Sequence, residues 1–310
     1  MSFLAHRSSD KTLDGLRFLP PRPLSECTSL KVGGTPVCFA EVFHEDGLEG
    51  LCSLGWPLRV LGRGSNLIVD DGELPFGVVR FQGALTKTLP ILGVEGDKVF
   101  LEAFSGVALR AMAKKALEMG GGGLEFGITI PGSLGGALRM NAGAHGQEIG
   151  PLVESLTVFD PKRGELRKLK KEEFSFGYRS FEVRGASDDS LFLVNALLLL
   201  TKRDPKDISA TMDAFLSKRK ATQPSGVSSC GCVFKNPPLP MPSAGRLLDL
   251  SGLKGACIGG AMVSQAHANF FVNTGNAKAS DFFRLIDLAR NRVLKDHGIS
   301  LSLEVEIWRG

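Results

Sequence analysis

The chain has 310 residues, of which 43% are hydrophobic and 23% are charged, and its formal net charge is +4 at pH 7. This length predicts about two domains, and the composition excludes disordered and collagen-like chains. The small excess of Lys and Arg is spread along the whole chain, which argues against a protein that binds nucleic acid or a membrane surface.

The segments in which a signal or an anchor would lie lack the necessary apolar length. Residues 1–10 contain no apolar core of signal-peptide length, and the most apolar run, residues 191–200, is too short to span a membrane. The six cysteines are too sparse for a disulfide scaffold in a chain of this size. We therefore expect a cytoplasmic protein with reduced thiols.

Short apolar runs between glycine-rich turns predict strands early in the chain, at residues 37–42, 58–61, 66–69, 78–81 and 99–104. Apolar residues at helical spacing then predict a helix over residues 107–120, with glycines at its end. Later strands are expected at residues 152–159, 166–169 and 191–200, and later helices at residues 207–221, 244–251 and 280–296. Strands and helices alternate without a regular βαβ period, which favours an α+β fold.

The two elements nearest the C-terminus have recognisable apolar faces. In the helix over residues 280–296, the side chains expected largely on the buried side are Phe282, Phe283, Leu285, Ile286 and Leu288. Residues 300–308 predict a last strand that returns to an earlier sheet. Its core-facing residues are expected to be Leu301, Leu303, Val305 and Ile307, with Ser302, Glu304, Glu306 and Trp308 facing away.

Three glycine-rich segments, at residues 31–34, 62–66 and 127–137, could each hold a phosphate group. Successive backbone N–H groups without side chains in the way suit such an anion, although tight turns alone also explain each segment. No Gly-Lys-Ser/Thr closes them as in a Walker A loop, and no acidic residue follows at the distance of a Rossmann fingerprint.

With their flanking residues these segments belong to an ordered set of motifs along the chain. The set comprises TSLKVGG at 28–34, GRGSNL at 62–67, IPGSLGGA at 130–137, MNAGA at 140–144, GYRSF at 177–181, CGCVFKNP at 230–237, AGRLL at 244–248, GLKG at 252–255, HANF at 267–270 and LEVE at 303–306. In order and spacing it resembles the UDP-N-acetylenolpyruvoylglucosamine reductase (MurB) family. The short segment between Ser180 and Asp204 resembles the family's shorter, second class.

The resemblance implies a fold of the vanillyl-alcohol oxidase (PCMH) type, with FAD held non-covalently between two α+β subdomains and a separate α+β substrate-binding domain. The implied boundaries are residues 1–83 with 299–310, residues 84–203, and residues 204–298 for the substrate domain. The residues implied for FAD are Gly62, Arg63, Gly64, Ser65, Asn66, Leu67, Ile130, Pro131, Gly132, Ser133, Gly135, Gly136, Ala137, Asn141 and Ala142.

The implied reaction belongs to peptidoglycan precursor synthesis: NADPH reduces FAD, and the reduced flavin then reduces UDP-N-acetylglucosamine enolpyruvate to UDP-N-acetylmuramate. Because an enol ether is electron-rich and resists hydride, the enzyme needs a positive partner for the substrate carboxylate and an acid that protonates C2. A monomer is expected, with no bound metal.

Arg179 suits the first need, because a guanidinium grips a carboxylate in a fork and stays charged at any working pH. It resembles the arginine of the family's Tyr-Arg-x-Ser motif, although here Phe181 stands in the place of the motif's serine. Tyr178 beside it is the only tyrosine of the chain, which has twenty phenylalanines. Glu304 resembles the family's C-terminal glutamate and is expected near the carboxylate, although a solvated strand position explains it too.

The proton donor is where the chain departs from the family, which normally has serine where this chain has Cys232. A thiol is a stronger acid than an alcohol, so we expect Cys232 to donate the proton and Cys230 to be structural. A zinc site would need further Cys or His at ligand spacing, and a redox-active pair is usually Cys-x-x-Cys; both alternatives are therefore disfavoured.

Other residues are assigned to the substrate by resemblance. Lys218, Arg219 and Gln223 could meet the UDP diphosphate, or the basic residues could simply complement a helix C-terminus. Asn236, Lys254, His267 and Asn269 could line the substrate domain or be solvated, and His145 is expected to be structural. Two other readings stay open: a flavin oxidase of the same superfamily, and a flavin- or nucleotide-binding protein without catalysis.

Overall fold

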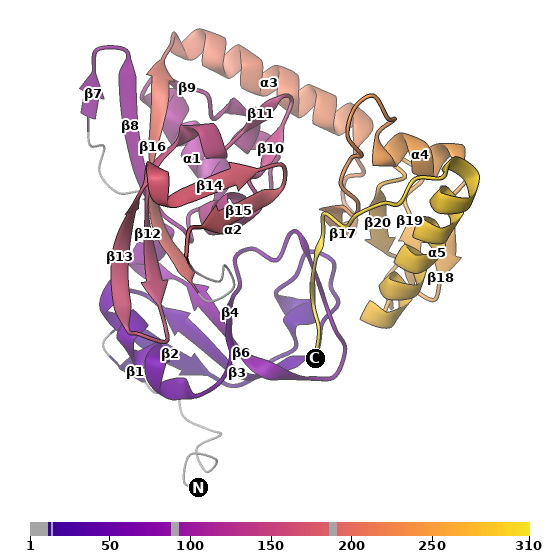
Figure 1. Cartoon of the computed structure of the whole chain (residues 1–310), viewed down its shortest axis with the longest axis horizontal. Coiled ribbons are helices and arrows are strands. Elements are labelled where there is room, and N and C mark those ends of the chain that lie inside the picture. Colours follow the sequence, from indigo (N-terminus) through magenta and orange to yellow (C-terminus); the bar gives the residue numbers. More distant parts are fainter. Residues whose placement is uncertain (1–11, 14, 88–92, 186–190) are drawn as a thin grey trace, which may run out of the picture. The chain divides into compact units, whose positions relative to one another are not determined.

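The computed structural model describes residues 12–13, 15–87, 93–185 and 191–310 (Figure 1). The prediction for residues 1–10 therefore lies outside the described residues. The chain divides into two compact units: unit 1 comprises Met1–Pro20, Cys38–Gly62 and Gly77–Lys218, and unit 2 comprises Pro21–Val37, Arg63–Phe76 and Arg219–Gly310. The finer division into three domains stays a prediction.

Unit 1 is built on an antiparallel sheet with the order β13-β12-β16-β8-β7. Its strands are β7 (Gly93–Glu95), β8 (Lys98–Phe104), β12 (Val153–Asp160), β13 (Glu165–Lys170) and β16 (Phe192–Lys202), and β9 (Gly121–Gly122) pairs with β16. The central strand β16 is a nearly continuous apolar run, as a strand covered on both faces requires. Helix α1 (Leu109–Glu118) buries Leu109, Met112, Ala113 and Ala116, which follow the helical period.

A second sheet has the order β1-β2-β3-β6-β4. Its strands are β1 (Thr12–Leu13), β2 (Leu16–Leu19), β3 (Thr35–Val42), β4 (Leu58–Val60) and β6 (Glu73–Phe81). Unit 1 also contains shorter elements, some of which carry candidate site residues. They are the 3-10 helices η2 (Glu45–Leu54), η3 (Gly83–Thr86), η4 (Glu125–Thr129), η5 (Gly150–Leu152) and η6 (Lys171–Glu173), helix α2 (Leu134–Arg139), and the hairpins β10 (Gly143–Ala144) with β11 (Gln147–Glu148) and β14 (Phe174–Gly177) with β15 (Ser180–Val183).

Helix α3 (Pro205–Thr222) spans the point at which the chain passes from unit 1 to unit 2. Unit 2 contains the sheet β17-β20-β19-β18, and helix α5 contacts β18 and β19 (Figure 1). Its elements are η1 (Leu24–Glu26), β5 (Leu67–Val69), β17 (Ser228–Cys232), α4 (Ala244–Leu250), β18 (Cys257–Ile258), β19 (Ala261–Val263), β20 (Phe270–Asn273), α5 (Ala279–His297) and β21 (Glu306–Trp308). Gly298, with φ 68°, ends α5 in the left-handed conformation that favours glycine.

The predicted α+β character is confirmed, and each predicted helix and strand overlaps an observed one. The last strand is shorter than predicted, because only Glu306–Trp308 pair, in parallel with β5. The expected alternation also fails at its end: Trp308 is buried, edge-on to Phe76 with the ring centroids 5.7 Å apart. Within the described ranges, we find no helix with both the length and the apolar character needed to cross a membrane.

Two residues of α5 depart from the predicted buried face. Leu288 is 41% exposed and Phe283 is only partly buried, with the Arg309 guanidinium 3.8 Å from its ring centroid. Both lie at the edges of the stripe formed by the fully packed residues of α5, which are Phe282, Leu285, Ile286, Ala289 and Val293. The apolar run is therefore wider in the sequence than the face that the helix buries.

Candidate active site

Arg179 lies in the two-residue turn between β14 and β15, after Gly177 pairs with Ser180. Its φ is +55°, a left-handed conformation that costs a residue with a side chain free energy. Its Nη1 donates to the backbone oxygen of Asn141 (3.3 Å) and its Nη2 to that of Gly143 (2.9 Å). The guanidinium also lies 5.1 Å from the ring centroid of Tyr178, which is half exposed. The backbone thus holds a charged group in a fixed place.

Phe181, which stands in the place of the serine of the Tyr-Arg-x-Ser motif, is a packing residue of the hairpin. Its ring is buried and packs 5.1 Å from that of Phe176 and 6.3 Å from that of Phe174. The guanidinium of Arg139 lies 5.8 Å from the same ring. The position therefore belongs to the small aromatic core of this hairpin, and its side chain has no hydroxyl to offer a ligand.

The residues predicted for FAD include a helix N-terminus with very close backbone packing. Ser133 caps α2, since its Oγ accepts from the backbone N–H of Gly136. A Cβ on Gly62 would lie 2.4 Å from that Oγ, and a Cβ on Gly135 would lie 2.9 Å from the Cβ of Ser105. A side chain at position 62 would displace the capping hydroxyl, and one at position 135 would press against Ser105, so glycine allows this close packing.

Ser105 is a candidate that the sequence analysis missed. Its Oγ is buried and has no hydrogen-bond partner among the described residues, and its backbone oxygen accepts from Gly135 N–H (2.8 Å). A buried hydroxyl without a partner is costly, and a bound polar group would satisfy it. The unpartnered Ser105 hydroxyl therefore makes this part of unit 1 fit a bound polar cofactor. The remaining predicted contacts of this region are Ile130, Pro131, Gly132, Ala137, Asn141 and Ala142, all in unit 1.

The other predicted FAD segment, residues 63–67, belongs to unit 2. Gly64 is buried with φ +61°, and a Cβ there would lie 2.5 Å from the backbone oxygen of Cys27. Asn66 turns its amide inward, and its Nδ2 donates to the backbone oxygen of Glu304 (3.1 Å). Ser65 is half-buried, Arg63 is exposed and Leu67 is buried at the start of β5. The loop is thereby tied to the segment that carries Glu304.

Cys230 and Cys232 face different surroundings because β17 contains a bulge. Ser229 pairs with Val272 and Cys232 with Phe270, so β17 has one extra residue, and Gly231 there has φ +80°. In a regular strand residues i and i+2 share a face, and the extra residue reverses that relation. Cys230 is fully buried, which raises the pKa of its thiol to about 12, whereas Cys232 is half-buried. Cys230 is therefore an inert packing residue, as predicted.

Glu304 lies beside the same strand end. Its backbone N–H donates to the oxygen of Val233 (2.8 Å), and Phe234 and Leu303 form an antiparallel bridge. Glu304 is half-buried, unlike Glu306, which is exposed. The structure therefore brings together three of the predicted residues, Asn66, Cys232 and Glu304, within unit 2.

Asn269 and His267 support the segment that follows Cys232. The Asn269 side chain is buried, and its Oδ1 accepts from Phe234 N–H (2.9 Å) while its Nδ2 donates to Phe234 oxygen (2.8 Å). His267 Nδ1 accepts from Asn269 N–H (3.2 Å), and burial, with the charge of Lys254, lowers the pKa of the imidazole. Both side chains therefore hold backbone in place.

The other predicted substrate residues occupy varied positions. Lys254 pairs with Asp249 (3.1 Å), and Asn236 Oδ1 accepts from Ala244 N–H (3.0 Å) at the start of α4. Gln223 follows α3, and its Oε1 is buried with no partner among the described residues, which suits an acceptor of a ligand hydrogen bond. Lys218 and Arg219 lie in the last turn and a half of α3.

His145 stacks on Phe215 of α3, with the ring centroids 4.1 Å apart. Burial, with the charge of Lys218, lowers its pKa. The imidazole is therefore a packing group between the β10–β11 hairpin and α3, in keeping with its predicted structural role.

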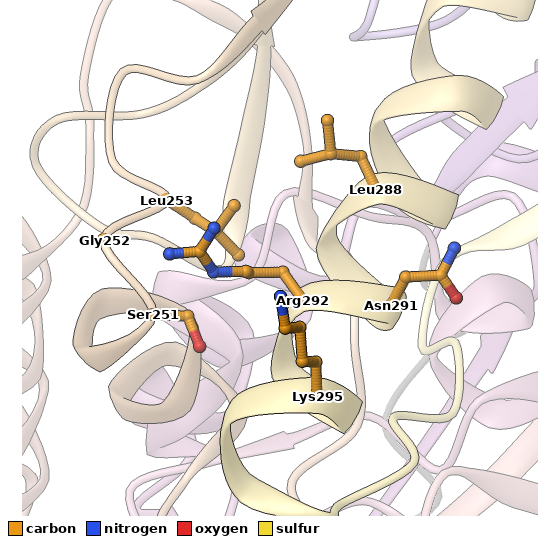
Figure 2. A pocket seen from close by; sticks show the side chains of 7 residues that line it. All are labelled: Ser251, Gly252, Leu253, Leu288, Asn291, Arg292 and Lys295. Atoms are coloured by element: carbon orange, nitrogen blue, oxygen red, sulfur yellow. The ribbon is translucent and has the colours of Figure 1, made fainter.

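A hollow of about 500 Å³ lies between the end of α4 and α5 (Figure 2). Its lining residues are Ser251, Gly252, Leu253, Leu288, Asn291, Arg292 and Lys295. None of the predicted site residues lines it, and it is wide open to solvent. The candidate site residues are therefore identified by their hydrogen bonds and packing, and this hollow is not part of the candidate site.

Comparison with known proteins assigns the chain to a family. Residues 223–308 match the model of the UDP-N-acetylenolpyruvoylglucosamine reductase C-terminal domain, and residues 49–170 match that of an FAD binding domain. The chain is 40% identical over 291 residues to the UDP-N-acetylenolpyruvoylglucosamine reductase of Synechococcus sp. (strain RCC307), and the matched region covers 91% of each chain. It is 38% identical to the one of Thermotoga maritima, over 92% of this chain and 96% of the relative.

A solved structure agrees with this assignment. The crystal structure of UDP-N-acetylenolpyruvylglucosamine reductase (MurB) from Thermus caldophilus matches with a TM-score of 0.80 and 34% sequence identity, covering 94% of this chain and 99% of that chain. The predicted PCMH-type FAD-binding fold and the α+β substrate-binding part are therefore confirmed. The chain belongs to the UDP-N-acetylenolpyruvoylglucosamine reductase family and is an FAD-dependent oxidoreductase.

Proposed function

We propose that this chain reduces UDP-N-acetylglucosamine enolpyruvate to UDP-N-acetylmuramate, with NADPH as the hydride source and FAD bound non-covalently. The observation that carries the proposal is Arg179, a charged residue held in a left-handed turn by two backbone oxygens. A strained conformation that positions a charge is typical of functional sites.

Bound FAD would supply the hydride transfer, and the protein must do the rest: stabilise the developing charge, donate a proton and orient the substrate. Arg179 pairs with the substrate carboxylate and stabilises the negative charge that develops there as the hydride arrives. Cys232 donates a proton from Sγ to C2, and the Cys232 thiolate is reprotonated from solvent before the next turnover. Glu304 helps to orient the carboxylate end of the substrate beside Cys232.

We assign the diphosphate to the end of α3. Lys218 and Arg219 supply positive charge, and the buried Oε1 of Gln223 accepts a hydrogen bond from the nucleotide or sugar. Tyr178, exposed beside Arg179, offers its hydroxyl to the substrate. The product feeds peptidoglycan synthesis, and with it cell shape and division; we expect a cytoplasmic monomer.

One experiment tests the function against its alternatives. The purified protein should show a flavin spectrum that anaerobic NADPH bleaches and that UDP-N-acetylglucosamine enolpyruvate then restores. Recolouring by oxygen alone, with no response to the enolpyruvyl substrate, would support a flavin oxidase. A protein that binds flavin and responds to neither NADPH nor substrate would be a binding protein without this activity.

A further inference from the structure

Asn141 is a fully buried residue whose side chain reaches the base of the Arg179 turn. Its Nδ2 donates to the backbone oxygen of Gly177 (2.8 Å), the last residue of β14. Its Oδ1 accepts from the backbone N–H of Gly150 (2.9 Å). The amide thus bridges two backbone segments, one of which leads directly into Tyr178 and Arg179.

The backbone of the same segment holds the other end of Arg179. The oxygens of Asn141 and Gly143 accept from Nη1 and Nη2 of the guanidinium. The turn is therefore fixed twice by residues 141–143: at its base through Gly177, and at the tip of the arginine side chain. A shift of Asn141 would move both points together.

The residue type at position 141 follows from two demands. Its φ is +39°, a conformation that asparagine tolerates better than other residues with side chains. It also faces one backbone acceptor and one backbone donor, which only an amide of this length satisfies at once. A Cβ on Gly150 would lie 2.9 Å from the Asn141 Oδ1 and 2.7 Å from Phe176, so the close approach also requires glycine at 150.

We propose that Asn141 is a positioning residue for Arg179, rather than a ligand of FAD as the motif implies. The inference rests on the proposed function, because it assigns the positioned guanidinium to the enolpyruvyl carboxylate. Both polar atoms of the amide are engaged by backbone. Its loss should impair the step that uses Arg179 and spare the steps that depend only on the cofactor.

The test uses the flavin-loaded protein and the variant Asn141→Gly, which keeps the left-handed backbone and both backbone carbonyls but removes the amide. Oxidation of the reduced flavin by UDP-N-acetylglucosamine enolpyruvate should slow by about 10- to 100-fold, the range expected for a misplacement of about 1 Å. Reduction by NADPH and the dissociation constant of FAD should each stay within about 2-fold. Loss of FAD, or equal slowing of both half-reactions, would overturn the inference.

A matched control and a double-mutant cycle sharpen the result. The side-chain amide of Gln147, in the neighbouring β11, also makes two hydrogen bonds: its Oε1 accepts from Phe126 N–H (3.3 Å) and its Nε2 donates to Glu125 (3.2 Å). Neither bond involves residues 177–179. Gln147→Ala should leave oxidation by substrate within about 3-fold. In an Arg179→Lys background, Asn141→Gly should have less than about a 3-fold further effect, because the group that it positions is gone. Independent, multiplicative effects would contradict the inference.

A structural readout separates this inference from the proposed function. In protein labelled with ¹⁵N and ¹³C at arginine, the guanidinium of Arg179, assigned by Arg179→Lys, should show distinct Nη signals. Those signals should merge or broaden in Asn141→Gly if the turn is released. Unchanged signals would overturn the positioning role whatever the activity. A wild-type flavin that the enolpyruvyl substrate fails to oxidise would instead overturn the proposed function.

Discussion

The variant Arg179→Gly distinguishes what Arg179 contributes to the stability of the fold from what it contributes to the reaction rate. The left-handed conformation at φ +55° costs a residue with a side chain about 1–2 kcal/mol. Glycine avoids that cost but loses about 0.5–1 kcal/mol more backbone entropy on folding. The side chain also makes two hydrogen bonds to backbone oxygens, each contributing about 0.5–1.5 kcal/mol. We therefore expect Arg179→Gly to lower the free energy of unfolding by only about 1 kcal/mol.

The catalytic loss should be far larger than the loss of stability. Removing a positioned group that stabilises developing negative charge typically costs about 10²- to 10³-fold in rate. Stopped-flow oxidation of the reduced flavin by the enolpyruvyl substrate measures this loss, and urea denaturation measures stability. Reduction by NADPH should be unaffected, because it does not use the carboxylate partner.

Lys31→Gly is the matched control for the stability arithmetic, since Lys31 is exposed and has φ +62°. The same arithmetic, without side-chain hydrogen bonds, predicts that Lys31→Gly raises the free energy of unfolding by about 0.5–1 kcal/mol. If Arg179→Gly left the oxidation rate within about 3-fold of wild type while stability fell by several kcal/mol, Arg179 would be a structural residue and the reasoning would be refuted.

Three further predictions concern unit 2. Cys232→Ser should keep substantial oxidation of the reduced flavin by substrate, whereas Cys232→Ala should lose about 10²- to 10⁴-fold; equal rates for wild type and the alanine variant would exclude the thiol as donor. Gly231→Ala should lower the free energy of unfolding, measured in urea, by about 1–2 kcal/mol, because its φ is +80°. The new Cβ would cause no clash, since its nearest neighbour would be the Ser65 oxygen at 4.0 Å. The variant should also slow oxidation by substrate, and an unchanged rate would mean that the bulge does not orient Cys232. The pKa of Asp281 is lowered by hydrogen bonds, first from the backbone N–H of Lys278, then from that of Gly260 and from the side chain of Arg284. The contribution of the ionised carboxylate to stability is therefore complete above the ordinary carboxyl pKa of about 3.9. It is lost as the pH falls through the lowered pKa of the folded protein. Thermal unfolding of Asp281→Asn should therefore differ from wild type most near pH 7 and progressively less below about pH 4, and a pH-independent difference would contradict this account.

The sequence pattern predicted elements well where apolar period and glycine punctuation agree. The buried strand β16 and the helices α1 and α5 belong to this class. The pattern failed at the C-terminal strand, because Trp308 owes its burial to a parallel pairing with residues that lie more than 200 positions earlier. Alternation within one segment carries no information about such a partner.

The sequence predicted which residues belong to the candidate site better than it predicted the backbone contacts that hold them in place. Arg179, Cys232 and Glu304 followed from the resemblance, and their catalytic roles stay predictions. The bulge at Gly231 and the burial of Cys230 follow from pairing with β20, which periodicity alone does not reveal. Ser105 had no signal beyond its place at the end of a strand, since an unsatisfied hydroxyl is defined only by its three-dimensional surroundings.

Backbone strain offers a pointer to the site that is independent of the comparisons. Among the described residues, four positions other than glycine have a positive φ: Lys31, Asn141, His145 and Arg179. Three of the four lie in one hydrogen-bonded unit, since Arg179 bonds the oxygens of residues 141 and 143 and His145 turns the hairpin that begins at 143. A fold retains such costs where a side chain is needed at a place that glycine would fill more easily. The strained positions therefore cluster around the turn that carries Arg179. Glycine substitutions at these positions will measure how the cost of each left-handed conformation compares with the hydrogen bonds that its side chain makes.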